Sequence, residues 1–153
     1  MNSLNKQEIA TKFFDSGYNC AQSVLMTFSD ELNLNKEIAT NIASGFGGGM
    51  ARMQNTCGAV TGGIMTIGMA LSNEKEDIVT NKERVYHVIS LFTSKFKEKY
   101  RSVKCRDLLN CDLNTEEGQQ FYEEHELHQK VCMSCVCDAT AYLEELLKKF
   151  LSQ

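Results

Sequence analysis

Residues 57–71 read Cys-Gly-Ala-Val-Thr-Gly-Gly-Ile-Met-Thr-Ile-Gly-Met-Ala-Leu, an uncharged stretch that we expect to form a buried helix. It is shorter than the roughly 20 apolar residues that cross a membrane, so we expect no membrane span. Each glycine costs about 1 kcal/mol in a helix relative to alanine. Four glycines therefore imply a compensating gain, since small side chains let another backbone or a bound group approach closely.

Segments on both sides of this stretch place apolar residues at helical spacing, and none shows the sustained alternation of a strand. The 153 residues contain no proline, so long helices are uninterrupted. The expected helices span residues 4–15, 19–32, 37–44, 57–72, 81–100, 105–109, 114–129 and 132–151. We therefore expect an all-α fold: residues 1–153 form a single domain, a helical bundle of about five main helices.

A glycine-rich loop, Gly45-Phe-Gly-Gly-Gly-Met50, precedes the central stretch. It is not a dinucleotide-binding motif, because Met50 replaces the required glycine and no strand precedes it. Its N–H groups, close to the start of the next helix, are suited to an anion, a thiolate or a cluster sulfide. The candidate cofactor-binding residues are Gly47, Gly48, Gly49 and Gly58.

Seven cysteines are an unusual number for a chain of this size, and an odd number cannot all pair within one chain. Residues 1–15 lack the apolar core of a secretion signal, so we expect a cytoplasmic location, where structural disulfides are rare. The cysteines then favour metal, cluster or redox chemistry. The net charge of −4 argues against nucleic acid as a partner.

Four cysteines lie at the start of an expected helix: Cys20, Cys57, Cys105 and Cys132. The unpaired N–H groups and partial positive charge of a helix N-terminus stabilise a thiolate. We expect these helix starts to meet at one end of the bundle. The result would be a reversible dithiol couple, with Cys57 as the accessible nucleophile and Cys20 as a second catalytic residue, or a four-thiolate metal or iron–sulfur centre.

The chain resembles a family of redox-active proteins with the C_GCAxxG_C_C cysteine pattern. The matching stretches are Cys57-Gly-Ala-Val-Thr-Gly62, Tyr18-Asn-Cys-Ala-Gln-Ser-Val24, Ser44-Gly-Phe-Gly-Gly-Gly-Met50, Cys105-Arg-Asp-Leu-Leu109, and Cys132 with Val136 and Ala139. The resemblance implies redox activity and four signature cysteines at positions 20, 57, 105 and 132. Met133 stands where members often have proline, and Cys135 and Cys137 are additional, so any of the three C-terminal cysteines could fill the last position.

The alternative is a non-catalytic metal-binding module for storage, sensing or delivery. His125, His128, Cys132 and Cys135 could form a tetrahedral zinc site, although solvated histidines are the more common situation. A group of methionines around the glycine segment could bind Cu(I) beside thiolates, although such groups more often fill a core. These methionines are Met50, Met53, Met65 and Met69.

The function we expect from the sequence is a cytoplasmic redox-active or electron-transfer protein, either a thiol- or cluster-based oxidoreductase or a carrier without catalysis. An iron–sulfur cluster or zinc is the expected cofactor if there is one. The redox partner is not identified by any motif. Apolar helix faces left uncovered would allow a homodimer.

Overall fold

The computed structural model describes residues 3–152, so the outermost residues of the expected 1–153 domain lie outside the described part. No β-strand occurs between residues 3 and 152, which confirms the all-α class. The expected number of about five main helices is wrong, and two short helical elements that the sequence analysis does not predict, at residues 47–50 and 128–132, also form. The elements are α1 (Lys6–Asp15), α2 (Cys20–Thr27), α3 (Lys36–Ala43), α4 (Gly47–Met50), α5 (Gly58–Leu71), α6 (Ile78–Tyr100), α7 (Cys105–Leu109), α8 (Glu116–Glu124), the π-helix η1 (His128–Cys132) and α9 (Met133–Leu151).

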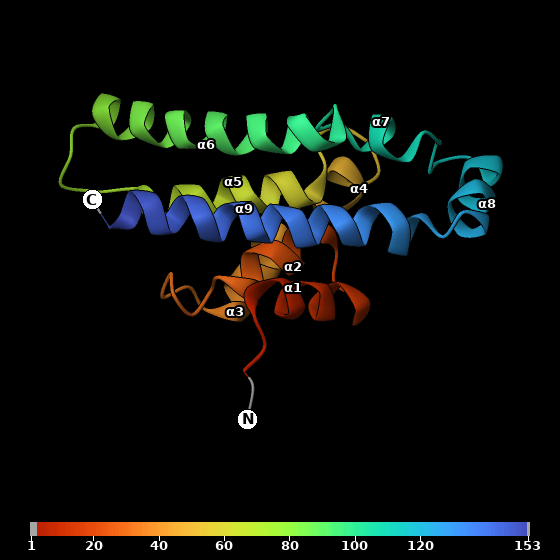
Figure 1. Ribbon diagram of the computed structural model, residues 1–153, viewed down its shortest axis with the longest axis horizontal. Helices are drawn as coiled ribbons and strands as arrows, with labels where there is room; N and C mark the ends of the chain where they lie inside the picture. Colours follow the sequence, from red (N-terminus) through yellow and green to blue (C-terminus); the bar gives the residue numbers. More distant parts are fainter. Residues whose placement is uncertain (1–2, 153) are drawn as a thin grey trace.

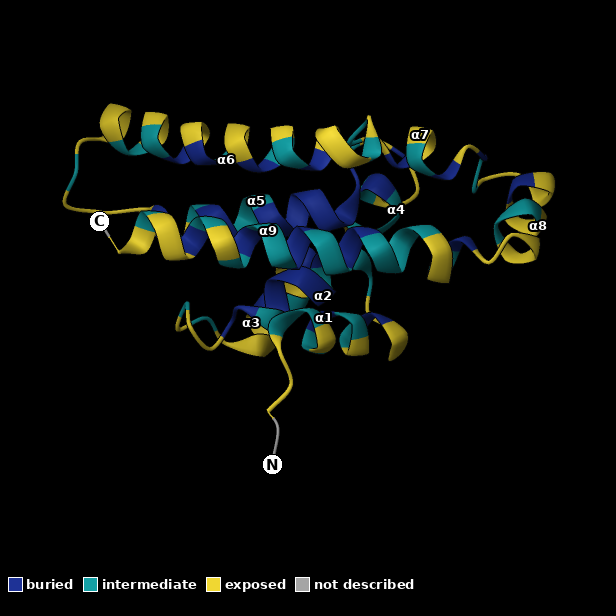
Figure 2. Cartoon of the chain, viewed as in Figure 1, coloured by how far each residue is buried: buried dark blue, intermediate teal, exposed yellow. Residues whose placement is uncertain are grey.

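Helices α5, α6 and α9 form the long part of the bundle, and α1, α2 and α3 lie below them (Figure 1). Helix α6 turns its buried side toward α5 and α9 and its exposed side to solvent (Figure 2). The fully buried residues of these three helices include Val60, Ile67, Phe92, Val136 and Leu143. Burying side chains of this size stabilises the fold by about 1.5–3 kcal/mol each.

Asparagine caps fix the starts of the first two helices. The Asn19 side chain accepts a hydrogen bond of 2.8 Å from the Gln22 N–H, and the Gln22 side chain accepts one of 2.9 Å from the Asn19 N–H. This reciprocal pair of hydrogen bonds is a capping box. Asn5 and Glu8 form a second one at α1. The cap at Asn19 orients the first residue of α2, which is Cys20.

Helices α2 and α5 cross at very short distance because α5 has glycines at the contact. A Cβ added to Gly58 would lie 2.9 Å from the Cβ of Cys20, and one added to Gly62 would lie 2.8 Å from the carbonyl oxygen of Ala21. Real Cβ atoms do not approach so closely, so alanine would not fit without a shift. The expectation that these glycines permit a close backbone approach is confirmed.

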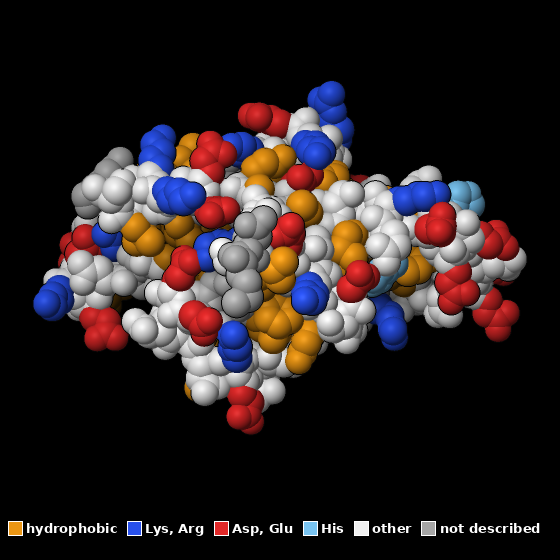
Figure 3. All heavy atoms as spheres, turned by 60° about the horizontal axis from the view of Figure 1, so that its bottom comes forward, with side chains coloured by type: hydrophobic (Ala, Val, Ile, Leu, Met, Phe, Trp, Pro, Cys, Tyr) orange, Lys and Arg blue, Asp and Glu red, His pale blue; other side chains and the backbone are white. Residues whose placement is uncertain are grey.

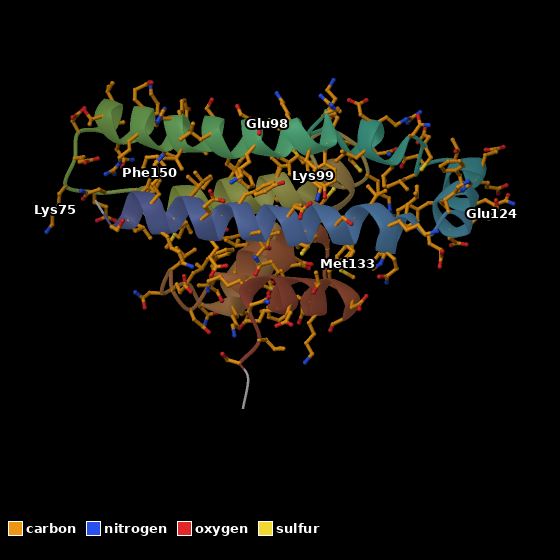
Figure 4. The ribbon with its side chains drawn as sticks, viewed as in Figure 1. Lys75, Glu98, Lys99, Glu124, Met133 and Phe150 are labelled. Carbon is orange, nitrogen blue, oxygen red and sulfur yellow. The ribbon has the colours of Figure 1, made fainter. Side chains whose placement is uncertain are left out.

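Helices α6 and α9 make polar contacts in addition to their apolar contact. Asp138 of α9 accepts hydrogen bonds of 2.5 Å from both the Lys99 ammonium and the Tyr100 hydroxyl of α6. Lys99 extends from α6 toward α9 in Figure 4. Exposed ion pairs contribute little stability, typically about 0–1 kcal/mol.

On the face that carries α1, basic and acidic side chains are interspersed with apolar ones (Figure 3). Ile38 and Ile42 of α3 are both more than half exposed. Among residues 3–152, no helix is long and apolar enough to cross a membrane.

Candidate functional site

Two distant segments, 54–57 and 103–106, pair in antiparallel fashion directly before α5 and α7. The Cys57 N–H donates to the Val103 carbonyl at 2.7 Å, and the Cys105 N–H donates to the Asn55 carbonyl at 2.7 Å. Cys57 occupies the N-cap of α5, and Cys105 is the first residue of α7. The pairing therefore brings two predicted site cysteines together, although they are far apart in sequence.

The glycine-rich segment forms an unusual left-handed turn. Residues 48–52 all have positive φ, and Met50, Ala51 and Arg52 among them have values of 67°, 51° and 65°. A left-handed conformation costs roughly 1–2 kcal/mol for each residue with a Cβ. Gly49 lies directly against α7, because an added Cβ would be 2.7 Å from the Cβ of Cys105. The strained turn thus forms part of the wall beside Cys105.

Cys132 is not at a helix start, which corrects the sequence-based expectation. It is the last residue of the π-helix η1, and η1 continues into α9 without a break in helical backbone angles. The backbone N–H groups at this position already have helical partners, so the helix-terminus argument does not apply to Cys132. Single π-helical turns are frequent at functional sites, because they reorient side chains within a helix.

A pocket of about 230 Å³ lies where α2, α5, α7 and η1 meet. All four predicted cysteines line it, namely Cys20, Cys57, Cys105 and Cys132, and Cys135 joins them. Apolar side chains such as Phe14, Leu108 and Val131 form much of the remaining wall. The structure therefore brings the four signature positions to one place.

Three of the four candidate glycines, Gly48, Gly49 and Gly58, also line this pocket, whereas Gly47 borders a neighbouring hollow. Gly47 packs against Asn19, since an added Cβ would lie 2.5 Å from the Cβ of Asn19. The visible contribution of these glycines is close packing around the cysteines.

The cysteines differ in their exposure to solvent. Cys57 and Cys105 are each 7% exposed and Cys135 is 1% exposed. Cys20 and Cys132 are only partly buried. The expectation that Cys57 is accessible is wrong, because α2 and the segment before α7 cover it. Cys20 and Cys132 are therefore the pocket thiols most accessible to an external reagent.

Cys20 and Cys132 both line the pocket, and each thiol shifts the pKa of the other. The Cys20 thiol lowers the pKa of Cys132, and the same interaction raises the pKa of Cys20 well above its usual value, with burial adding to the rise. The Tyr122 hydroxyl lies 3.7 Å from the Cys132 sulfur and also lowers the pKa of Cys132. Within this pair, Cys132 is the favoured thiolate and Cys20 the favoured thiol.

Cys57 and Cys135 are more deeply buried in the same pocket, and they also shift each other's pKa. The Cys135 thiol lowers the pKa of Cys57, and the N–H groups of Ala59 and Val60 at the start of α5 act in the same direction. Interaction with Cys57 and burial raise the pKa of Cys135 strongly. Cys105 stands apart, since burial raises its pKa to about 12.

The sequence leaves open which of Cys132, Cys135 and Cys137 fills the last position of the site. In the structure both Cys132 and Cys135 line the pocket, whereas Cys137 does not, so Cys135 is a fifth cysteine of the site. The signal was present in the Cys132-x-x-Cys135 spacing, because residues three apart lie on the same face of a helix. Burial and the charge of Asp138 raise the pKa of Cys137, on another side of α9.

The zinc site suggested by the C-terminal residues is not formed. His125 stacks on Phe121 with ring centroids 3.9 Å apart, and His128 stacks on Phe14 at 4.2 Å. Across residues 3–152, no three His, Cys, Asp or Glu side chains are grouped closely enough to hold a metal ion.

The methionines proposed as Cu(I) ligands do not lie at this pocket. Among the residues that line it there is no methionine. Met53 and Met69 are instead exposed, at 63% and 49%.

Comparison with known proteins adds one positive finding. A family model described as "Putative redox-active protein (C_GCAxxG_C_C)" matches residues 18–146, which include every cysteine of the pocket. No curated protein and no solved structure was found to match the chain. Since the family model covers most of the sequence, the chain belongs to the C_GCAxxG_C_C family of redox-active proteins.

Proposed function

We propose that this protein exchanges electrons with disulfide substrates through the Cys20 and Cys132 thiols. The observation that carries the proposal is the pair of partly exposed thiols that line one pocket, with the pKa of one member lowered and that of the other raised. A nucleophilic thiolate beside a protonated thiol is the arrangement that thiol–disulfide exchange requires. Membership of a redox-active family supports the general role.

In the proposed reaction, the Cys132 thiolate attacks one sulfur of the substrate disulfide. A mixed disulfide forms, and the other substrate sulfur leaves as a thiolate. The partner that kept the Cys20 proton in place is then gone, so the pKa of Cys20 falls. Cys20 loses its proton and attacks the Cys132 sulfur. The protein is left with a Cys20–Cys132 disulfide, and the substrate is released as two thiols.

Three neighbouring groups support this chemistry. The Tyr122 hydroxyl donates to the Cys132 thiolate and holds its negative charge. Phe14 and Val131 provide an apolar wall that limits water at the sulfurs. The seven cysteines are all free, which suits a reducing compartment, so we propose a cytoplasmic location and a thiol or disulfide partner there.

A metal or iron–sulfur centre is the second candidate, because the number of signature thiols at the pocket equals that of a four-cysteine cluster. Thiolate sulfur is chemically suited to both. Within the described residues, however, no three His, Cys, Asp or Glu side chains are grouped closely enough to hold a metal ion. The arrangement of the thiols in this structure does not fit a metal centre.

The test starts with anaerobic purification, metal and sulfide analysis and a visible spectrum. The protein is then equilibrated in buffers with different ratios of reduced to oxidised glutathione, alkylated and mapped by mass spectrometry. We expect no stoichiometric metal, and a Cys20–Cys132 disulfide that forms and disappears reversibly with the buffer ratio. Cys137→Ala, a change on the same helix outside the pocket, should behave like the wild type.

Two results would contradict the proposal. The first is stoichiometric iron and sulfide, or zinc, that is lost in Cys20→Ala. The second is equal alkylation of Cys20 and Cys132 at every ratio of glutathione.

A further inference from the structure

We infer that Cys57 and Cys135 form a second, inner dithiol, which receives the disulfide from the Cys20–Cys132 pair and stores it away from solvent. The inference rests on the function proposed above for the outer pair. It assigns a role to Cys135 beside Cys132, although the family pattern needs only one of these two cysteines for its last position.

The backbone places each inner cysteine next to an outer one. On α5, Cys57 directly precedes Gly58, and Gly58 packs against Cys20 so closely that an added Cβ would lie 2.9 Å from the Cys20 Cβ. On the opposite wall, Cys135 lies about one helical turn after Cys132, on the same face. All four cysteines line the same pocket. The outer and inner pairs therefore adjoin along two helices.

Burial separates the roles of the two pairs. Cys135 is 1% exposed and Cys57 is 7% exposed, whereas Cys20 and Cys132 are partly accessible. These low exposed fractions disfavour direct attack of the inner thiols on a disulfide as large as oxidised glutathione. The oxidant that can reach them is the Cys20–Cys132 disulfide itself. The N–H groups of Ala59 and Val60 hold Cys57 as the attacking thiolate, with a lowered pKa.

The exchange balances without a further reagent. The Cys57 thiolate attacks the Cys20 sulfur, the Cys20–Cys132 bond breaks, and Cys132 leaves as a thiolate. The Cys135 thiol then gives up its proton to the departing Cys20 sulfur and attacks the Cys57 sulfur. A Cys57–Cys135 disulfide has formed, Cys20 is a thiol and Cys132 is a thiolate. Two electrons have moved from the inner to the outer pair, which is ready for a second substrate.

The test uses the full chain, reduced under anaerobic conditions and then treated with oxidised glutathione. Samples are quenched by alkylation at increasing times and mapped as intact protein and as peptides. In the wild type we expect the Cys20–Cys132 disulfide first and the Cys57–Cys135 disulfide later, with two disulfides per chain in excess oxidant. Cys135→Ala should stop at one disulfide, between Cys20 and Cys132, while the control Cys137→Ala should reach two.

A further variant tests the order of events. Cys132→Ala removes the outer disulfide, so the Cys57–Cys135 disulfide should then form at least tenfold more slowly with oxidised glutathione. The inner dithiol is overturned if wild-type peptides link Cys57 to Cys105, or if Cys135→Ala still forms two disulfides. It is equally overturned if only Cys20–Cys132 forms, an outcome that leaves the proposed function intact. Failure of the proposed function looks different, because Cys20–Cys132 is then absent in every variant.

Discussion

Helices α5 and α9 carry large apolar side chains along their middle and cysteines at one end. In the middle, Phe92 of α6 is fully buried and its ring fills the space over Gly63 of α5. At the end that carries the cysteines, three backbone segments depart from regular α-helix. It contains the left-handed turn of residues 48–52, the paired segments before α5 and α7, and the π-helix η1.

The difference shows how one bundle separates stability from chemistry. Regular helices packed through Phe92 and similar side chains provide the free energy of folding. That free energy offsets a strained left-handed turn and buried thiols at the other end, where the geometry suits reaction more than stability. Substitutions in the two regions should therefore affect different measurements.

The largest effect on stability is expected for Phe92→Ala in the middle region. Loss of this ring removes apolar contacts and leaves a cavity over Gly63, at a cost of about 3–5 kcal/mol. Urea denaturation followed by circular dichroism measures the change. Thiol exchange of the protein that remains folded should be unaltered, and an altered rate would contradict the separation of the two regions.

A smaller effect should come from glycines on the same helix. Gly62→Ala places a Cβ 2.8 Å from the Ala21 carbonyl oxygen, so the α2–α5 contact must open. We expect a loss of about 1–3 kcal/mol in the free energy of unfolding. Gly68→Ala is the matched control, since nothing lies within 4 Å of its added Cβ. It should stabilise the protein by up to about 1 kcal/mol through helix propensity. Equal effects of the two changes would show that the close crossing does not matter.

At the cysteine end, Tyr122→Phe removes the hydroxyl 3.7 Å from the Cys132 sulfur. The pKa of Cys132 should rise, because its thiolate loses a stabilising donor. The rate of alkylation by iodoacetamide should fall at neutral pH, by about tenfold for each unit of pKa. Its midpoint should move to higher pH. Tyr18→Phe, a change elsewhere on the same pocket wall, should leave the pH profile in place. An unchanged profile for Tyr122→Phe would remove Tyr122 from the site.

The smallest expected effect concerns the left-handed turn. Ala51 has φ of 51° and ψ of 43°, a conformation that glycine adopts without strain. Ala51→Gly should therefore stabilise the fold by roughly 0.5–1 kcal/mol, after allowing for the greater entropy of glycine in the unfolded chain. Thermal unfolding detects a change of this size. Ala70→Gly, inside α5, should have the opposite sign. A destabilising Ala51→Gly would argue that the turn is not strained.

Much of the helical pattern follows from local signals. The apolar spacing and the absence of proline predict α5, α6 and α9 with boundaries close to the observed ones. The start of α2 is also close to the predicted one, but α2 ends at Thr27 and not at the expected residue 32. Other boundaries depend on tertiary contacts. The helix predicted over residues 114–129 is shorter in the structure: Thr115 is its N-cap and accepts a hydrogen bond from the Gly118 N–H, and α8 ends at Glu124. The reason is that Gly118 packs directly on Asp112, which fixes where the chain enters the helix.

The sequence by itself determined the all-α class and the four signature cysteines, because periodicity and motif spacing are local properties of the chain. Only the tertiary structure decided which thiols pair. Cys20 meets Cys132 and Cys57 meets Cys135 because α2 and α5 cross closely at Gly58 and because η1 leads into α9 with a π-helical turn. The same π-helical turn places Cys132 inside a continuous helix, at the junction of η1 and α9, and not at the helix start that the sequence predicts. Pairing and burial depend on how helices pack, and residues far apart in sequence set that packing.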